Sequence, residues 1–317
     1  MSSVPDAPVA PVGVVVMAYG TPAGPHDIEA YYTHVRRGRP PPPDLLDDLQ
    51  RRYRAIGGVS PLAERTRAQA GALADALERR APESYVVEVG YKHTAPFVED
   101  AVERLVAAGA RRLVGLVLAP HYSRGSVGEY LGRLRARASA LDPAVDVVAV
   151  VDWHLEPAYV SFLADELRRC LVGMPAATQV VFSAHSLPVR VVVDGDPYAT
   201  QVAETAAAVA SAVGLSSPTG WSVAWQSAGR TSEAWIGPDV LEVFATLAAS
   251  GRAAGVVVCP CGFVSDHLEV LYDLDHEAAG RAAELGLAFT RTAVPNDDPA
   301  VLGALADRVV AASTDAA

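Results

Sequence analysis

The sequence predicts an α/β protein of two similar lobes, each with a four-stranded parallel sheet flanked by helices, and with a cleft between the lobes. Short apolar segments alternate with longer amphipathic segments along the 317-residue chain, a pattern typical of βαβ units with right-handed crossovers. The pattern restarts after Asp152, so that about four strands fall on each side of it. Such Rossmann-like lobes usually bind ligands in the cleft that separates them.

The first lobe is expected over residues 1–156. Its first strand, Gly13–Ala18, is a continuous apolar run that ends in turn residues at Tyr19–Pro22. Four consecutive prolines, Pro40–Pro43, break the chain between the first two helices. The further strands are expected at Tyr85–Gly90, Arg112–Ala119 and Val145–Val151, and the helices at Asp27–Arg37, Asp44–Ala55, Pro61–Arg80, Pro96–Ala108 and Val127–Leu141.

The second lobe is expected over residues 157–290 and repeats the alternation. Its strands are expected at Gln179–Ala184, Ser222–Gln226, Gly255–Cys259 and Ala288–Val294. Its helices are expected at Pro157–Val172, Tyr198–Val213, Asp239–Ser250 and Val264–Leu285. The last segment, residues 291–317, contains a helix at Pro299–Ala312 and is expected to pack back on the first lobe.

The composition excludes several classes of protein. The formal net charge of −11 argues against a nucleic-acid partner, because nucleic-acid-binding proteins usually carry basic faces. No apolar run is long enough to span a bilayer, and Met1–Pro11 lacks the pattern of a signal peptide. Three cysteines fit a reducing compartment and are one short of the usual four ligands of a [2Fe–2S] cluster: Cys170, Cys259 and Cys261. We expect a cytoplasmic monomer without an iron–sulfur cluster and without a membrane or nucleic-acid partner.

Two predicted strand ends carry chemistry. His185 lies in Ser183–Pro188, which follows a buried strand, and Glu269 lies in a segment that follows another. The carboxyl ends of strands in an open α/β sheet are where ligands bind. A single histidine at such a place is more often structural, but an imidazole and a carboxylate together can hold a divalent metal or move protons.

An acidic row starts at Glu269. Asp273 and Glu277 follow it at intervals of four residues, which places the three carboxylates on one face of the predicted helix. Such a row is often a solvated helix face. Like charges in a row repel each other unless water or a cation lies between them, so the row can also carry hydrated metal ions inward or protons outward.

Basic residues cluster within twenty positions of the first lobe. The cluster consists of Arg36, Arg37, Arg39, Arg51, Arg52 and Arg54. A solvated helix face would explain it, but arginine also pairs bidentately with carboxylates, which favours a rim for a multiply carboxylated ligand.

Two common motifs are missing: Tyr19–Pro22 matches neither glycine-rich phosphate loop, and no GxSxG nucleophile elbow surrounds Ser183.

Seven motifs resemble those of ferrochelatases. They follow one another in the order of that family, from about Val14 to Val310. They are Met17–Pro22 (MAYGTP), Tyr31–Arg39 (YYTHVRRGR), Gly57–Ala63 (GGVSPLA), Ser183–Pro188 (SAHSLP), Trp225–Ser227 (WQS), Gly237–Val240 (GPDV) and Gly262–Tyr272 (GFVSDHLEVLY). Ferrochelatases insert Fe²⁺ into a porphyrin and release two protons, so the resemblance implies a chelatase-like fold and a lyase that takes Fe²⁺ as substrate and requires no resident cofactor.

The resemblance also implies roles for individual residues. His185 and Glu269 would bind the incoming iron and accept the pyrrole protons, while Asp273 and Glu277 would lie on the iron's path and Tyr19 would contact the porphyrin iron from the opposite face. The residues implied to hold the macrocycle and its propionates are Tyr19, Arg36, Arg52, Tyr53, Ser60, Lys92 and Tyr130, with His93 nearby. Because a base must be neutral to accept a proton, we expect His185 to titrate near its ordinary pKa.

The segment His34–Ala55 indicates which porphyrin is used. Membrane-associated members of the family act on protoporphyrin IX and carry an apolar lip near the cleft, whereas soluble members act on coproporphyrin III. Here the segment is rich in Arg, Asp and Pro, and six arginines suit four propionates. The resemblance therefore favours a coproporphyrin III ferrochelatase of haem biosynthesis, with transient contacts to neighbouring enzymes of that pathway.

Other functions stay open at this point. The chain can be a protoporphyrin IX ferrochelatase, or a chelatase that inserts cobalt or nickel into sirohydrochlorin, although those proteins tend to offer a His-rich metal site. A carrier that binds coprohaem without chemistry would need the arginine rim and Tyr19 but neither His185 nor Glu269. A periplasmic two-lobe binding protein is disfavoured by the missing export signal.

Overall fold

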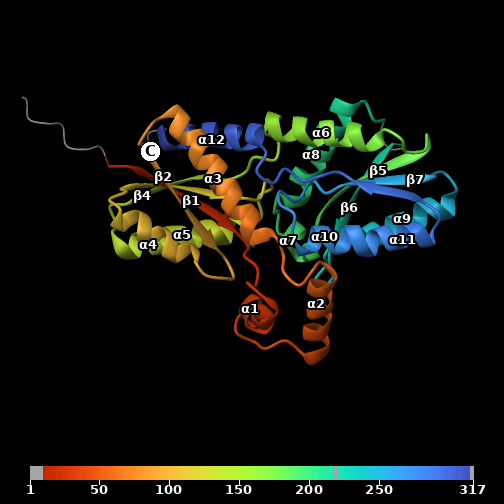
Figure 1. Cartoon of the computed structure of the whole chain (residues 1–317), viewed down its shortest axis with the longest axis horizontal. Helices are drawn as coiled ribbons and strands as arrows, with labels where there is room; N and C mark the ends of the chain where they lie inside the picture. Colours follow the sequence, from red (N-terminus) through yellow and green to blue (C-terminus); the bar gives the residue numbers. More distant parts are fainter. Residues whose placement is uncertain (1–9, 217–219, 315–317) are drawn as a thin grey trace, which may run out of the picture.

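Two four-stranded parallel sheets lie side by side in the computed structural model, which describes residues 10–216 and 220–314 (Figure 1). The strand order is β2-β1-β3-β4 in the first sheet and β6-β5-β7-β8 in the second. The strands are β1 (Val12–Ala18), β2 (Tyr85–Tyr91), β3 (Arg112–Val117), β4 (Asp146–Val150), β5 (Thr178–His185), β6 (Trp221–Gln226), β7 (Gly255–Cys259) and β8 (Ala288–Arg291). The predicted fold class is confirmed.

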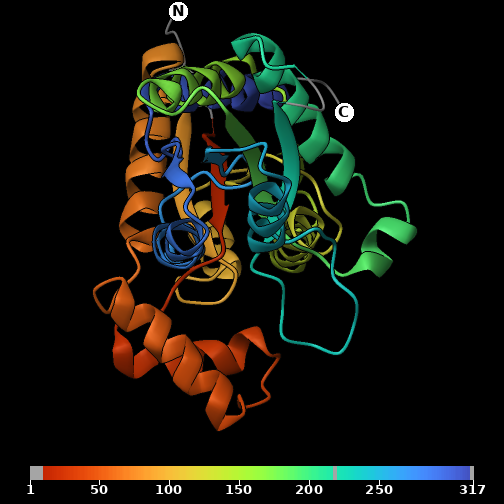
Figure 2. The same ribbon diagram turned by 90° about the vertical axis from the view of Figure 1, so that its right-hand side faces the viewer.

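Helices cover both faces of each sheet. They are α1 (Ile28–Val35), α2 (Pro43–Ala55), α3 (Leu62–Arg80), α4 (Val98–Ala107), α5 (Val127–Leu141), α6 (Pro157–Leu171), α7 (Val189–Val193), α8 (Tyr198–Val213), α9 (Val240–Ser250), α10 (Leu268–Leu271), α11 (Ala279–Glu284) and α12 (Pro299–Thr314). The pair α1 and α2, which we call the lip (residues 28–55), projects below both lobes (Figure 2). Among the described residues, no helix has the length and apolar character needed to cross a membrane.

One apolar core extends through both lobes. Alternate residues of β1 point to opposite faces of the sheet and are fully buried. Val15 and Met17 pack against α4 and α5, whereas Val14 and Val16 pack against α3 and α12. The core around Val14 continues through α6 and α8 into the second sheet. Because close-packed interiors resist deformation, this shared core fixes the strand ends of one sheet relative to those of the other.

The last helix returns to the first lobe. Arg80 on α3 donates to Asp307 Oδ2 on α12 at 2.9 Å, and the hydroxyl groups of Tyr85 and Ser313 lie 2.7 Å apart. These contacts support the division of the chain expected from the sequence. We keep that division as a proposal, with boundaries at residues 1–156, 157–290 and 291–317.

The predicted helix Val264–Leu285 is wrong in its first and middle parts. Two residues from other elements hold its start in an irregular conformation: Gln69 accepts from Ser265 Oγ, and Asn296 Oδ1 accepts from the backbone N–H of Asp266, each at 2.9 Å. The helix therefore begins only at α10. A π-helical turn, Asp273–Ala278, then separates α10 from α11. Such turns occur often at functional sites.

A buried polar contact joins the loop after β3 to α8 of the second lobe. His121 is 2% exposed, and its Nε2 lies 2.9 Å from Thr205 Oγ1. Thr205 donates its one hydroxyl proton to the backbone carbonyl of His154 or Gln201, so the His121 Nε2–H is the donor. His121 Nδ1 has no hydrogen-bond partner within the described ranges. Burial, followed by the neighbouring His154, lowers the pKa of His121 to about 3.

His121 makes the fold sensitive to acid. The unfolded chain binds a proton at His121 near pH 6.5, whereas the folded chain keeps this ring neutral down to about pH 3. The free energy of unfolding therefore falls by about 1.4 kcal/mol for each pH unit below 6.5. We expect His121→Gln to remove this contribution, so that the wild type loses its advantage over the variant as the pH drops. Denaturant unfolding of both proteins between pH 7 and pH 5 measures this, and a constant difference would contradict a buried, neutral His121.

Candidate active site between the two lobes

The carboxyl ends of β5 and β7 bring His185 and Glu269 together. His185 is the last residue of β5, and Glu269 lies in the first turn of α10, which follows β7. His185 Nε2 lies 3.6 Å from Glu269 Oε1. On the other side of the carboxylate, His267 Nε2 lies 3.6 Å from Glu269 Oε2. The two residues selected from the sequence are therefore neighbours, and a second imidazole joins them.

Close backbone packing holds this pair in place. The loop after β7 passes so near β5 that a Cβ on Gly262 would lie 2.4 Å from the Cβ of Ala184, so this position requires glycine. Gln226, the last residue of β6, connects the two strand ends. Its side chain accepts from Ser183 Oγ at 2.8 Å and donates to the backbone carbonyl of Glu269 at 2.9 Å. The first two strands of the second sheet thus fix the backbone of α10.

The charges of the pair depend on each other. Partial burial lowers the pKa of His185, but the Glu269 carboxylate and a hydrogen bond from Nδ1 to the Ser186 carbonyl outweigh it and raise this pKa to about 9. Burial raises the pKa of Glu269, but His185 and His267 bring it well below its ordinary value. At neutral pH the metal-free pair is an imidazolium beside a carboxylate. The expectation of a neutral His185 is wrong for the metal-free protein, and a metal ion must displace this proton to bind Nε2.

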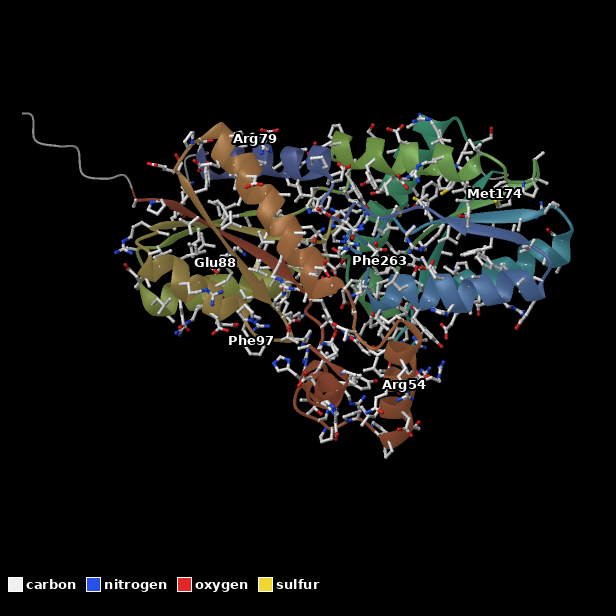
Figure 3. The ribbon with its side chains drawn as sticks, viewed as in Figure 1. Arg54, Arg79, Glu88, Phe97, Met174 and Phe263 are labelled. Atoms are coloured by element: carbon white, nitrogen blue, oxygen red, sulfur yellow. The ribbon has the colours of Figure 1, made fainter. Side chains whose placement is uncertain are left out.

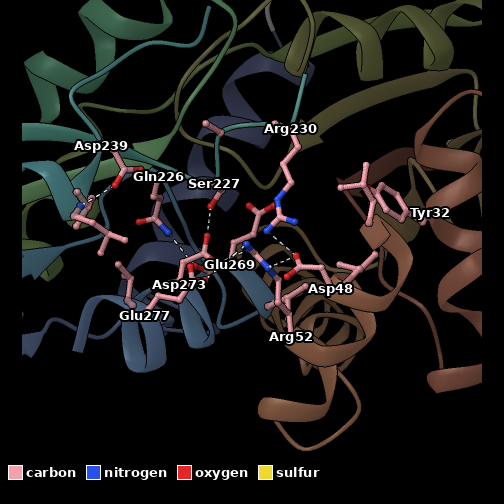
Figure 4. A pocket seen from close by; sticks show the side chains of 18 residues that line it. Tyr32, Asp48, Arg52, Gln226, Ser227, Arg230, Asp239, Glu269, Asp273 and Glu277 are labelled. Carbon is pink, nitrogen blue, oxygen red and sulfur yellow. Dashed lines mark hydrogen bonds and ion pairs between the residues drawn. The ribbon is translucent and has the colours of Figure 1, made fainter. Parts of the chain in front are cut away.

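Asp273 and Glu277 continue the row from Glu269. All three carboxylates line one pocket of about 310 Å³ between the lip and the second lobe (Figure 4). The π-helical turn replaces the regular α-helical spacing expected for them, but the pocket still contains all three. Burial, followed by the Glu269 carboxylate, raises the pKa of Asp273 to about 7. Asp273 is therefore near its titration midpoint at neutral pH.

Arg52 on α2 contacts the acidic row. Its Nη1 lies 3.3 Å from Asp273 Oδ1, and its Nη2 lies 3.8 Å from Glu277 Oε1. Ser227, at the end of β6, donates from Oγ to Asp273 Oδ2 at 2.5 Å. Arg52 thereby ties the lip to the second lobe and offsets part of the negative charge of the row.

Tyr19 comes from the first lobe, directly after β1. Its side chain is 43% exposed and packs on the ring of His93, with ring centroids 4.5 Å apart. A second pocket of about 430 Å³ is lined by Tyr19, Lys92 and His93 among others. Desolvation by the protein around the ring, followed by the Glu269 carboxylate, raises the pKa of Tyr19 above its ordinary value, so the phenol is protonated at neutral pH. The first lobe thus places the Tyr19 phenol at one pocket, and the second lobe places the Glu269 carboxylate at the other.

Arg36 and Lys92 are the other cationic residues selected from the sequence. Arg36 Nε is buried without a hydrogen-bond partner among the described residues, and the guanidinium lies 5.7 Å from the centroid of the Tyr32 ring. A buried N–H group without a partner lacks the acceptor that a carboxylate would supply. Lys92 Nζ lies 2.8 Å from Glu129 Oε2 and 5.3 Å from the ring centroid of Tyr130, which is 3% exposed.

Tyr53 and Ser60 have internal partners. Both side chains are buried. The hydroxyl group of Tyr53 lies 3.1 Å from Thr21 Oγ1, and Ser60 Oγ accepts from the backbone N–H of Leu62 at the start of α3. The structure therefore buries Tyr53 at the end of the lip and Ser60 in the loop before α3, and gives each a hydrogen bond of its own.

Three residues of the site were missed by the sequence reasoning, although each lies within one of the seven motifs. His34 Nδ1 lies 3.0 Å from His93 Nδ1, and burial, followed by Lys92, lowers the pKa of His93 to about 4. His267 and Gln226 contact Glu269, as described above. Their motifs were recognised, but the sequence does not show which motif residues touch one another.

The three cysteines are free thiols, and Cys259 and Cys261 are buried. Burial raises the pKa of Cys259 to about 12, so its thiol is unreactive at neutral pH. In the part of the chain that the structure describes, no group of three or more His, Cys, Asp or Glu side chains is placed to hold a metal ion.

Comparison with known proteins agrees with this geometry. The ferrochelatase family model matches residues 11–313. The chain belongs to the ferrochelatase family. It is similar to a coproporphyrin III ferrochelatase of Geobacillus thermodenitrificans, with 43% identity over 94% of this chain and 95% of that protein. A coproporphyrin III ferrochelatase of Halalkalibacterium halodurans is 42% identical over 93% of this chain and 95% of that protein. The resemblance seen in the seven motifs is confirmed, and this ferrochelatase-family chain is a metal-chelatase enzyme, a lyase.

Solved structures of other chelatases share the fold. SirB from Bacillus subtilis with Fe³⁺ superimposes with a TM-score of 0.58 at 14% identity and covers 96% of each chain. CbiX, the terminal enzyme of sirohaem biosynthesis in denitrifying bacteria, gives a TM-score of 0.50 at 12% identity over 95% of this chain and 99% of that chain. At these identities the likeness concerns the two-lobed fold alone.

Proposed function

We propose that this ferrochelatase-family enzyme inserts Fe²⁺ into coproporphyrin III in haem biosynthesis, giving Fe-coproporphyrin III (coprohaem) and two protons. The observation that carries the proposal is the His185–Glu269 pair, 3.6 Å apart at the carboxyl ends of strands of the second sheet, with Glu269 lining the pocket of the acidic row. An imidazole and a carboxylate suit both a transient iron ligand set and proton transfer. The two relatives named above, at 42–43% identity over nearly the whole chain, support coproporphyrin III as the substrate.

The acidic row is the proposed path of iron. It begins at Glu277, whose side chain is 35% exposed, passes Asp273, which is 8% exposed, and ends at Glu269. Carboxylate oxygens bind hydrated divalent cations. In the metal-free protein the positive charge of Arg52 offsets part of the negative charge of the acidic row, and Fe²⁺ would take over this role. Iron remains a substrate throughout and is handed to the porphyrin.

The protons balance in two steps. Fe²⁺ binding to His185 Nε2 releases the imidazolium proton to solvent. When the metal moves into the ring, two pyrrole N–H protons leave, and the His185–Glu269 pair accepts them. One proton restores the imidazolium, and the second is lost from Glu269, whose pKa is well below its ordinary value. The net release is two protons per Fe²⁺, and the pair acts as one coupled unit.

We propose that the two lobes also lower the barrier to metal insertion. Metal insertion requires the flat porphyrin to pucker, and a rigid cleft that binds the puckered ring better than the flat ring lowers the barrier. The shared apolar core supplies this rigidity. Tyr19 is the proposed contact on the ring face opposite His185, and the proposed macrocycle and propionate contacts are Arg36, Arg52, Tyr53, Ser60, Lys92 and Tyr130.

The lip supports coproporphyrin III over protoporphyrin IX. Its helix α2 exposes four charged side chains to solvent: Asp44, Asp47, Arg51 and Arg54. Figure 3 labels Arg54 on α2 of the lip. A charged lip of this kind does not suit insertion among lipid chains. Our proposal also includes a cytoplasmic location, a monomeric state and transient contacts with neighbouring haem-pathway enzymes. The cysteines are free thiols, and we propose that the enzyme has no resident cofactor.

Anaerobic insertion assays with coproporphyrin III and protoporphyrin IX test the substrate. We expect kcat/KM for coproporphyrin III to exceed that for protoporphyrin IX by at least about tenfold, because two further propionates can pair with arginines. Each reaction is monitored by the loss of fluorescence of the metal-free porphyrin. A preference for protoporphyrin IX would contradict the coproporphyrin proposal while leaving the chelatase activity in place.

A further inference from the structure

Arg230 extends across the mouth of the pocket that contains the acidic row. It lies in the loop between β6 and α9, in the second lobe, and its Nη2 contacts Asp48 Oδ2 on α2 of the lip at 2.9 Å (Figure 4). Both residues line the same pocket as Glu269. The Arg230 side chain is 50% exposed, so a substrate that approaches from solvent can reach its guanidinium group.

The backbone of this loop is held by packing, whereas the Arg230 side chain is half-exposed. Ser227 turns the chain at a φ of 60° and is anchored by its hydrogen bond to Asp273. Trp235 then packs so closely on Gly229 that a Cβ there would lie 2.3 Å from the ring. The backbone of Arg230 is therefore held in place beside the pocket, and a long side chain on a fixed backbone can exchange one partner for another.

The charges favour such an exchange. Asp48 serves three guanidinium groups: Oδ1 lies 2.6 Å from Arg51 Nη2, and Oδ2 lies 3.0 Å from Arg52 Nε and 2.9 Å from Arg230 Nη2. When Arg230 leaves, Asp48 keeps two partners. Among the described residues Asp48 is the one ion-pair partner of Arg230, whereas Arg52 also contacts Asp273. Arg230 is thus the guanidinium of this group that a substrate carboxylate can take most readily.

We propose that Arg230 is a specificity-determining residue, which leaves Asp48 and binds a propionate of coproporphyrin III at the mouth of the cleft. This inference rests on the proposed function. Exchange of one half-exposed guanidinium–carboxylate pair for another is nearly neutral, so the bound substrate loses little by displacing Asp48. A porphyrin with propionates on all four pyrroles is then held by Arg36 from the lip and by Arg230 from the second lobe. Protoporphyrin IX, with propionates on two pyrroles, lacks a partner for Arg230.

Binding of the two metal-free porphyrins to Arg230→Gln tests the proposal. Fluorescence titration should show the Kd for coproporphyrin III rising about tenfold, while the Kd for protoporphyrin IX changes by less than about twofold. Arg190→Gln is the matched control. Arg190 makes a similar exposed ion pair with Glu233 of the same loop, at 3.1 Å, but does not line the pocket. The control should leave both Kd values unchanged, and an equal rise for both porphyrins in Arg230→Gln, or no rise for coproporphyrin III, would overturn the proposal.

The variant Asp48→Asn distinguishes two roles of the Arg230–Asp48 ion pair: exchange of Asp48 for a substrate propionate, and attachment of the lip to the second lobe. If Asp48 competes with the substrate for Arg230, its neutralisation leaves the Kd for coproporphyrin III equal or lower, opposite to the effect of Arg230→Gln. If the ion pair only holds the lip against the second lobe, both variants weaken binding alike, which would overturn the proposal.

These titrations contain no iron, so they are independent of turnover. A wild type that binds coproporphyrin III but inserts no iron contradicts the proposed function and leaves the Arg230 comparison valid. A wild type that inserts iron while Arg230→Gln binds both porphyrins normally contradicts only the role of Arg230.

Discussion

Replacement of His185 by alanine is expected to lower kcat for Fe²⁺ insertion into coproporphyrin III by about 10³-fold. The variant loses the nitrogen that lies 3.6 Å from Glu269 and with it the proposed iron ligand and proton acceptor. The Kd for metal-free coproporphyrin III should change by less than about twofold, because Tyr19 and the arginines that we propose as ring and propionate contacts stay in place.

The measurement is anaerobic turnover together with a porphyrin titration of the same preparation. His26→Ala is the matched control, since His26 is an exposed histidine outside both pockets. Its kcat should equal that of the wild type. If His185→Ala kept a wild-type kcat, or lost porphyrin binding in proportion to activity, the assignment of His185 to the metal side of the reaction would fail.

Replacement of Glu269 by glutamine is expected to lower kcat by about 10²-fold and to lower the pKa of His185. In the wild type, Glu269 keeps the pKa of His185 at about 9, so this ring is protonated at pH 7. Without the carboxylate, the two Glu269 contributions that raise the pKa of His185 are lost, while burial still lowers it. The pKa of His185 should therefore be lower in the variant than in the wild type.

Nitrogen-15 NMR of the histidine rings measures this pKa directly. Glu284→Gln is the control, because Glu284 makes an exposed ion pair with Arg281 on the same lobe. It should leave both kcat and the titration of His185 unchanged. A pKa of His185 that is unchanged in Glu269→Gln would contradict the coupling between the two side chains.

Much of the fold follows from local patterns in the sequence. The apolar run Gly255–Cys259 and the amphipathic segments Val127–Leu141 and Tyr198–Val213 were predicted with the bounds that the structure has. In these segments burial and periodicity agree, so a short stretch of sequence contains the necessary information.

Two elements were not predictable in this way. The start of the helix predicted at Val264–Leu285 is held by Gln69 and Asn296, which are distant in the sequence. The short helix α7, Val189–Val193, consists mostly of β-branched residues that favour strands, yet the Val189 N–H is bound to the carbonyl of Ala234 from another loop. In both cases tertiary contacts override local preference.

The candidate site likewise has features that the sequence predicts and features that depend on tertiary contacts. His185 and Glu269 were selected because each follows a buried strand, and their contact depends on topology that the pattern of strands predicts. Their charge states could not be predicted, because the pKa of His185 depends on distances between side chains. The pairing of Arg52 with Asp273 likewise depends on how the lip meets the second lobe.

Multiple turnover by the wild type tests the central claim most directly. Fe²⁺ and coproporphyrin III are supplied anaerobically in large excess over the protein, and the formation of Fe-coproporphyrin III is followed by absorbance. We predict many product molecules per chain at a steady rate, as expected of an enzyme that receives iron at His185 and Glu269. Tight binding of one porphyrin per chain without turnover would contradict this account and would instead indicate a carrier.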